Sequence, residues 1–366
     1  MRAAVLPAAG MALQVEELTI SPPRQGEVLV RLAAAGLCGT DMHAIDGELP
    51  LPLPCVLGHE GAGVVERVGP GVTELAPGDH VVLLWRASCG RCLYCSLGRP
   101  ALCDLGLRIR QTGRMPDGQT RFHRADGQEI HHFLGASTFA QYTVLPEAAT
   151  VKIRPDVPLE LAALIGCGVL TGVGAVVYAA AVPAGSSVAV FGTGGVGLNV
   201  VQGAALVGAE RIIAVDTRQN KLEMARTFGA THLVNATRED PVAAVRALTQ
   251  GRGADYAFEA IGLPATIAQA LDCVRKAGTA VVVGLAAAGA LVSIDPVALM
   301  QQEKTLRGSL YGSSRPRVDM PRLLDLYVAG KLKLDQLITR RYPLNEINDA
   351  VAAMRAGEVA RAVITL

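Results

Sequence analysis

The sequence predicts an α/β protein with a mostly β amino-terminal domain and a doubly wound parallel sheet in its second half. Up to about residue 150, short apolar segments are separated by turn signals such as Pro77-Gly78-Asp79, a pattern typical of a β domain. From about residue 160, short apolar runs such as VAVFG and RIIAVD alternate with helical stretches such as KLEMARTFGA and PATIAQALDCVRKAG. This alternation indicates βαβ units and a parallel sheet.

Composition limits the possible partners. The 366 residues leave room for two domains, and a chain that is 50% hydrophobic and 18% charged is too apolar to be disordered. The net charge is +1, so nothing attracts the chain generally to nucleic acid or to an anionic membrane. We therefore expect a small-molecule partner, with no nucleic acid and no membrane.

A long stretch in the middle of the chain carries no charged residue. The 49 residues 161–209 contain no Asp, Glu, Lys or Arg, which is long enough for a membrane span. The stretch also contains eleven glycines and Pro183, and the buried strands of parallel sheets give similar apolar runs. We expect buried strands here. Pro7 and Gly10 interrupt the apolar run at the amino terminus, so we expect no signal peptide and a cytoplasmic location.

A glycine-rich motif predicts a dinucleotide site. Gly192-Thr193-Gly194-Gly195-Val196-Gly197 follows the strand-like SVAVF and opens a helix-like stretch, the context that this motif requires. Asp216 ends the next apolar run, where a carboxylate can accept hydrogen bonds from the adenosine ribose. This arrangement favours NAD over NADP, although Arg218 close by is able to accommodate a 2′-phosphate.

Four of the eight cysteines predict a structural metal site. Their spacing is Cys89-x2-Cys92-x2-Cys95-x7-Cys103, which favours a metal over disulfides in a chain without a secretory signal. Four thiolates complete a tetrahedral zinc shell and leave no open position. An iron–sulfur cluster is the alternative.

Three further candidates are dispersed along the chain: Cys38 in GLCGTDMH, His59 in LGHEGAG and Cys167 in LIGCGVLTG. No spacing rule joins them. Together with the four-cysteine segment and the glycine motif, however, they occur in the order found in zinc-dependent medium-chain alcohol dehydrogenases. The chain resembles that family from about residue 26 to its end, and in particular its longer-lobed, liver-type members. The segment VVLLWRASCGRC also resembles the thiol-linked formaldehyde dehydrogenases of actinobacteria.

The resemblance implies a fold and two zinc sites. We expect a GroES-like catalytic domain over 1–168 with a structural zinc lobe at 89–103, a Rossmann domain over 169–310, and a segment 311–366 that returns to the catalytic domain. The active site is expected in the cleft between the domains. Cys38, His59 and Cys167 are the expected ligands of a catalytic zinc, with NAD as the second cofactor.

The implied chemistry is hydride transfer between a primary alcohol, or its aldehyde, and NAD. Three protein ligands leave zinc one position for the substrate oxygen, and the cation stabilises the alkoxide that gives up the hydride. In the family pattern Thr40 passes the released proton towards His43. Asp41 is expected to orient the ligand histidine, and Glu60 to approach the metal.

The resemblance also assigns a substrate pocket and further cofactor contacts. Trp85 is expected to narrow the pocket and to favour unbranched or planar primary alcohols. Gly39 departs from the basic residue or histidine of many relatives, which could weaken NAD binding. The expected pocket residues are Trp85, Leu134, Leu285 and Leu310, and the expected cofactor contacts beyond the glycine motif and Asp216 are Arg218, Lys221, Leu285 and Arg361, with Val196 behind the nicotinamide.

Three alternatives remain at this point. A thiol-dependent formaldehyde dehydrogenase, acting on a glutathione or mycothiol adduct, could use Arg86 or Arg108 to contact the carrier. A relative without zinc would be a silent NADPH-binding or quinone-reductase-like protein, and a nicotinoprotein would hold NAD permanently. The long lobe, 107–134, favours a homodimer by analogy, with a tetramer as the alternative.

Overall fold

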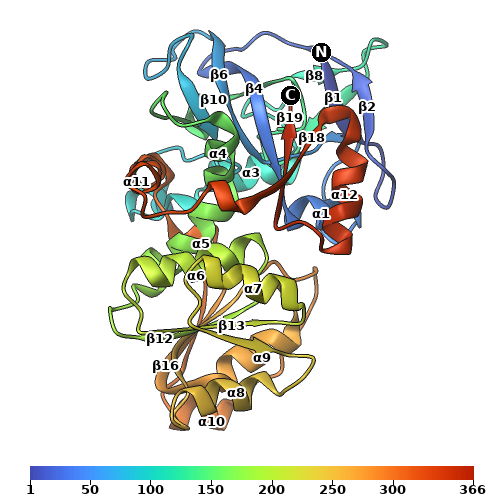
Figure 1. The fold of residues 1–366 in the computed structure, drawn as a ribbon. Helices are drawn as coiled ribbons and strands as arrows, with labels where there is room; N and C mark the ends of the chain where they lie inside the picture. Colours follow the sequence, from blue (N-terminus) through green and yellow to red (C-terminus); the bar gives the residue numbers. More distant parts are fainter. The chain divides into compact units, whose positions relative to one another are not determined.

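The computed structural model describes all 366 residues and divides the chain into two compact units. Unit 1 contains both ends of the chain and consists of Met1–Cys167, Arg315–Gly330 and Leu334–Leu366. Unit 2 consists of Gly168–Ser314 and Lys331–Lys333. Each is described separately below, with the element labels of Figure 1.

Unit 1 is built on two sheets in which antiparallel pairs predominate. The first has the strand order β2-β1-β5-β9-β8-β3. Its strands are β1 (Arg2–Leu6), β2 (Gln14–Glu17), β3 (Thr19–Ile20), β5 (Cys55–Val56), β8 (Phe122–His123) and β9 (Glu129–His132).

The second sheet of unit 1 positions part of the candidate site. Glu60 begins its strand β6 and Arg361 its strand β19, while Cys38 follows β4 and His59 precedes β6. Its order is β11-β7-β6-β4-β19-β18, and β10 also pairs with β4. The long strand β4 is buried along most of its length, as its run of apolar residues predicts. The strands are β4 (Glu27–Leu37), β6 (Glu60–Val68), β7 (His80–Leu83), β10 (Tyr142–Pro146), β11 (Thr150–Lys152), β18 (Ile338–Pro343) and β19 (Arg361–Thr365).

Short helices connect these strands. The helical segments of unit 1 are α1 (Gly39–Ile45), α2 (Leu93–Ser96), η1 (Pro100–Leu102), α3 (Asp104–Thr112), η2 (Glu147–Ala149), α4 (Leu159–Leu164), α11 (Pro316–Val328), η6 (Asp335–Leu337), η7 (Leu344–Glu346) and α12 (Ile347–Ala356). Gly357 ends α12 in the left-handed conformation that glycine adopts at little cost.

Unit 2 is a doubly wound parallel sheet in the order β14-β13-β12-β15-β16-β17. Helices α6 and α7 cover one face of it and α8 and α9 the other (Figure 1). The strands are β12 (Ser187–Phe191), β13 (Arg211–Asp216), β14 (His232–Asn235), β15 (Ala254–Glu259), β16 (Val274–Val282) and β17 (Thr305–Gly308). The helical segments are α5 (Leu170–Gly174), α6 (Gly195–Leu206), α7 (Gln219–Thr227), α8 (Pro241–Leu248), α9 (Pro264–Cys273), α10 (Pro296–Gln301) and η5 (Tyr311–Ser313).

Local sequence signals explain where several of these helices begin. Asp240 caps α8 by accepting a hydrogen bond from the Ala243 N–H at 2.7 Å, and Pro241 occupies the first helical position. Asp295 caps α10 in the same way. The predicted α/β fold class, with a parallel sheet in the second half, is confirmed.

The expectation of buried strands in the uncharged stretch is wrong for its first part. Residues Leu159–Ala180 form one continuous helix of 22 residues, in which Ile165–Val169 and Ala175–Ala180 are π-helical. The helix is long and apolar enough to cross a membrane, but 89% of its most apolar window is buried inside the fold. A fully buried helix and a fully buried strand both lack charged residues, so composition alone does not distinguish them.

The predicted helix PATIAQALDCVRKAG is also too long. Helix α9 ends at Cys273, and Val274 begins strand β16. Val274 pairs with Ala254 of the neighbouring strand, and Arg275 forms an ion pair with Asp255 at 2.6 Å. These long-range contacts override the local helical pattern.

Candidate active site and metal centres

The start of helix α1 holds two of the predicted metal ligands through one carboxylate. Asp41 is fully buried, and its Oδ2 accepts a hydrogen bond from the backbone N–H of Cys38 at 2.9 Å. Its Oδ1 lies 3.1 Å from Nδ1 of His59, the residue before β6. Burial alone would lower the pKa of His59, but the Asp41 carboxylate raises it well above its usual value. In the neutral ring that a metal requires, the contact with Asp41 keeps the proton on Nδ1 and leaves Nε2 as the ligand atom.

Cys167 completes a cluster suited to a metal. It lies in the π-helical turn of the long apolar helix, and its Sγ, the Sγ of Cys38, a ring nitrogen of His59 and a carboxylate oxygen of Glu60 all lie within 4.8 Å of one another. A hydrogen bond from Cys167 lowers the pKa of the Cys38 thiol, and the same contact raises that of Cys167. His59 Nε2 is buried without a hydrogen-bond partner. Two thiols and an unpartnered imidazole nitrogen fit zinc.

Glu60, a member of this cluster, is paired with a buried arginine. Its Oε1 is 3.0 Å from Nη1 of Arg361 at the start of β19. Burial raises the pKa of Glu60 to about 7, while the charge of Arg361 acts in the opposite direction. Gly36 lies opposite Glu60 in the β4–β6 pair, and a Cβ there would be 2.2 Å from Glu60 Oε2. The carboxylate therefore occupies space that only glycine leaves free.

The predicted proton-relay residues lie on α1. Thr40 and His43 are both half-buried. Nδ1 of His43 is 2.5 Å from Oε2 of Glu48, a carboxylate that is 47% exposed and lies just beyond the helix. Sequence patterns do not predict Glu48, because no motif connects it to His43. The turn after α1, in which the Glu48 N–H donates to the carbonyl oxygen of His43 at 2.9 Å, brings the two side chains together.

The four-cysteine segment forms a second cluster. The sulfur atoms of Cys89, Cys92, Cys95 and Cys103 lie within 4.8 Å of one another, and all eight cysteines are free thiols. The N–H of Cys89 donates to Sγ of Cys103 at 3.2 Å, and that of Cys92 to Sγ of Cys89 at 3.3 Å. Backbone N–H groups lower the pKa of Cys92 to about 6, whereas burial raises that of Cys95 to about 12. Four converging sulfur atoms fit a closed tetrahedral zinc site.

Unit 2 places the glycine motif between β12 and α6. Gly192 has a positive φ of 88°, and a Cβ on Gly197 would be 1.8 Å from the carbonyl oxygen of Gly192. Both positions therefore require glycine. Oδ2 of Asp216 accepts hydrogen bonds from the N–H and the hydroxyl of Thr193 at 2.8 and 3.0 Å. Asp216, the predicted ribose acceptor, thus contacts the glycine motif directly.

Comparison with known proteins gives the family. Residues 24–155 match the alcohol dehydrogenase GroES-like domain, and residues 195–329 match the zinc-binding dehydrogenases. The chain is 45% identical over 366 residues to the NDMA-dependent alcohol dehydrogenase of Amycolatopsis methanolica, covering 99% of this chain and 98% of that one. The chain belongs to the zinc-dependent medium-chain alcohol dehydrogenase family. It is therefore a zinc-binding oxidoreductase with a GroES-like domain, as the resemblance of its motifs implied.

Other members of the family carry different names. The S-(hydroxymethyl)glutathione dehydrogenase of Paracoccus denitrificans is 43% identical over 371 residues, with 99% of each chain covered. The structure of the benzyl alcohol dehydrogenase of Acinetobacter calcoaceticus matches with a TM-score of 0.95 and 38% identity, covering 100% of this chain and 99% of that one.

The remaining predicted residues of this dehydrogenase lie in both units. Trp85 and Leu134 are buried in unit 1, and Leu134 has a positive φ of 52°. In unit 2, Leu285 is exposed and Leu310 half-buried. Val196 and Lys221 are half-buried, and the N–H of Arg218 donates to Oδ1 of Asp216 at 3.0 Å. Their roles remain predictions.

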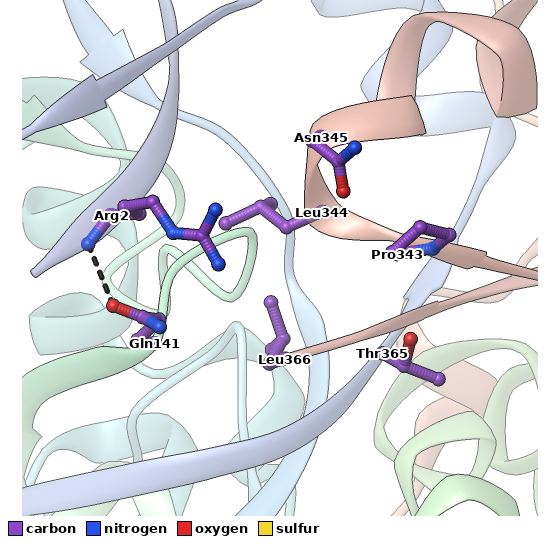
Figure 2. Close-up of a pocket in the computed structure, with 7 residues that line it drawn as sticks. All are labelled: Arg2, Gln141, Pro343, Leu344, Asn345, Thr365 and Leu366. Atoms are coloured by element: carbon purple, nitrogen blue, oxygen red, sulfur yellow. Dashed lines mark hydrogen bonds between the residues drawn. The ribbon is translucent and has the colours of Figure 1, made fainter.

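A cavity of about 220 Å³ near the chain ends contains none of the predicted site residues. Figure 2 shows the guanidinium of Arg2 directed into it and the Arg2 N–H bonded to Gln141. The lining residues are Arg2, Gln141, Pro343, Leu344, Asn345, Thr365 and Leu366. We assign it no part in the reaction.

Proposed function

We propose that the protein is an NAD-dependent dehydrogenase of primary alcohols, with a catalytic zinc held by Cys38, His59 and Cys167. The observation that carries the proposal is the buried cluster of two thiols and the unpartnered His59 Nε2. When bound, the zinc would act as a Lewis acid on the alcohol oxygen, and NAD would accept the hydride. Glu60, paired with Arg361, would supply a carboxylate oxygen as a fourth protein ligand when the metal exchanges ligands.

The chain's own residues would move the proton. The Thr40 hydroxyl would accept it from the substrate and pass it towards Nε2 of His43. Nδ1 of His43 would then donate to the Glu48 carboxylate, which is partly exposed to water. His43 suits this task because an imidazole ring can accept a proton at one nitrogen and donate one from the other.

We propose that 169–310 binds NAD, and that 1–168 and 311–366 carry the zinc sites and the substrate. The N–H groups at the start of α6 would receive the pyrophosphate. Asp216 would accept a hydrogen bond from the adenosine ribose through its remaining lone pairs and would repel a 2′-phosphate. Lys221, Leu285 and Arg361 are proposed as further cofactor contacts, and Trp85, Leu134 and Leu310 as pocket walls.

A second candidate function is a thiol-dependent formaldehyde dehydrogenase. The support is the name of the P. denitrificans relative, which acts on S-(hydroxymethyl)glutathione. The structure weakens one expected anchor for such a carrier, because Arg86 is only 4% exposed and donates from Nε to the carbonyl oxygen of Ala101. Arg108 is exposed and remains available.

The deciding experiment is NADH formation by the zinc-loaded enzyme. The panel contains linear, aromatic and secondary alcohols, and formaldehyde with and without glutathione or mycothiol. Turnover of primary alcohols without a thiol supports the main proposal, and activity only with formaldehyde plus a thiol supports the second. A protein without zinc would indicate the catalytically silent alternative. NAD that stays bound through purification would indicate a nicotinoprotein.

We also propose a cytoplasmic homodimer formed through the edge of the unit 2 sheet. All four residues of the edge strand β17 are exposed, and an unpaired strand edge favours pairing with a second copy. Exposed apolar side chains accompany it in unit 2: Leu291, Val297, Met300 and Leu306.

Light scattering tests the oligomeric state. We expect a dimer for the wild type and monomers for Arg307→Pro. The control is Val328→Lys, a substitution at an exposed residue of unit 1. A monomeric wild type would contradict the proposal, and a tetramer would require a second interface.

A further inference from the structure

Arg86 is a buried cation that forms no ion pair with a carboxylate. Its side chain is 4% exposed, and its Nε donates to the carbonyl oxygen of Ala101 at 3.1 Å. Its Nη1 is buried and has no hydrogen-bond partner. Burying an unpaired charge strongly destabilises a protein, so an anion that balances this one is expected nearby.

The contacts of Arg86 lead to the four-cysteine cluster. Ala101 lies in the turn η1, which runs directly into Cys103. On the other side of Cys103, a Cβ on Gly106 of α3 would be only 3.0 Å from Cδ of Arg86. The arginine side chain is therefore held between the two segments that flank Cys103, the most deeply buried of the four cysteines.

The charged groups around Arg86 include one further cation and two potential anions. Burial lowers the pKa of its guanidinium, and the charge of Arg110 adds to this, whereas Cys103 and Asp104 oppose both effects. Among these neighbours, Asp104 is exposed to water and Cys103 is buried. Cys103 is therefore the neighbour whose negative charge would be least screened by solvent.

We propose that Arg86 is the counter-cation of the four-cysteine zinc site and slows the loss of its metal. The inference rests on the proposed zinc in this lobe. Four thiolates and one Zn²⁺ carry a net charge of about −2, of which backbone N–H groups compensate only part. Arg86 supplies a buried positive charge beside Cys103, and the metal site supplies the anion that Arg86 lacks. Arg86 is thus committed to the lobe and is not an anchor for a substrate carrier.

The test follows zinc loss site by site in the holoenzyme. Zinc content is measured first, and a chelator is then added together with iodoacetamide, so that mass spectrometry reports alkylation of each cysteine as its site empties. Peptides with Cys89–Cys103 report the lobe, and those with Cys38 and Cys167 report the catalytic site within the same molecule. Arg86→Gln keeps a donor for Ala101 but removes the charge, Arg86→Lys keeps the charge, and Arg99→Gln alters an exposed arginine of the same lobe.

We expect Arg86→Gln to lose lobe zinc at least about tenfold faster than wild type, within the range known for residues that support metal ligands. The catalytic site should be unaffected, Arg86→Lys should stay within about threefold of wild type, and Arg99→Gln should match wild type.

Two results would overturn the counter-cation role. One is unchanged zinc loss in Arg86→Gln, and the other is equally fast loss in the Gln and Lys variants, which would assign the effect to shape and not to charge. If Arg86→Gln does not fold, Arg86→Lys decides alone, because a charge role requires it to retain lobe zinc. A wild type with one zinc per chain and freely alkylated lobe cysteines would instead refute the proposed zinc in the lobe.

Discussion

Oδ1 of Asp41 lies 3.1 Å from Nδ1 of His59, while Oδ2 of the same carboxylate accepts the backbone N–H of Cys38 at 2.9 Å. One buried side chain thus positions two proposed zinc ligands that are 21 residues apart in sequence. It also leaves His59 Nε2 as the free nitrogen of the ring.

Asp41→Asn should weaken zinc binding at the catalytic site by about 10- to 100-fold, because the amide cannot accept both hydrogen bonds with a full negative charge. Competition with a chromophoric chelator measures the affinity. The control is Asp46→Asn at the end of the same helix, where the side chain pairs with Arg355 on the surface. Equal affinity in both variants would show that Asp41 does not orient the ligands.

Gly36→Ala should destabilise unit 1 by about 1–3 kcal/mol, the usual range for overpacking a buried site. The new Cβ would be 2.2 Å from Glu60 Oε2 and would displace that carboxylate from Arg361. Denaturant unfolding measures the loss. Gly39→Ala is the matched control, because a Cβ there meets no atom within 4 Å. A loss of the same size in both variants would exclude a specific clash.

Glu48→Gln should reduce kcat several-fold without a comparable change in the KM for alcohol, because His43 loses the carboxylate that takes up the proton from Nδ1. Added imidazole or another basic buffer should restore part of the rate by accepting the proton directly. Steady-state kinetics at several buffer concentrations provide the measurement. A full-rate variant with no buffer dependence would remove Glu48 from the proton path.

His132 should make the protein less stable in mild acid. Burial lowers its pKa to about 3, and its Nε2 accepts the N–H of Arg121 at 3.1 Å, which requires the neutral ring. Its folded pKa lies below the unfolded value of about 6.5, so the unfolded state binds more protons between these values and stability falls as the pH falls through this window.

This linkage amounts to about 2 kcal/mol between pH 7 and pH 5. Denaturant unfolding at the two pH values should show a smaller difference in His132→Gln, whose amide oxygen can still accept the Arg121 N–H. An equal difference in the variant and the wild type would assign the acid sensitivity to other groups.

Trp85→Ala should widen substrate acceptance towards secondary alcohols, if the buried indole narrows the substrate pocket as proposed. The measurement is the ratio of kcat/KM for a secondary and a primary alcohol. We expect the ratio to rise at least about tenfold, the order that one buried contact supplies. An unchanged ratio would mean that Trp85 does not line the pocket.

Sequence patterns predicted most of the fold but failed where distant contacts decide. The glycine motif and the strands of unit 2 follow from local spacing. The sequence of the helix Leu159–Ala180 shows no helical period, because burial removes the polar face that would reveal it. The local pattern extends helix α9 too far, because the pairing of Val274 with Ala254 that ends it is a tertiary contact.

The sequence by itself determined the four-cysteine set and the dinucleotide motif, because each is a local pattern of residue types. The order of several such motifs along the chain gave the family, and with it the dispersed set Cys38, His59 and Cys167. Only the tertiary structure brought Arg361 to Glu60, Glu48 to His43 and Arg86 to the segments beside Cys103. For Arg361 and Arg86 the physical reason is that a buried charge must find a partner in space, and the folded chain supplies that partner without regard to sequence separation. Glu48 is partly exposed, and the turn after α1 places it beside His43.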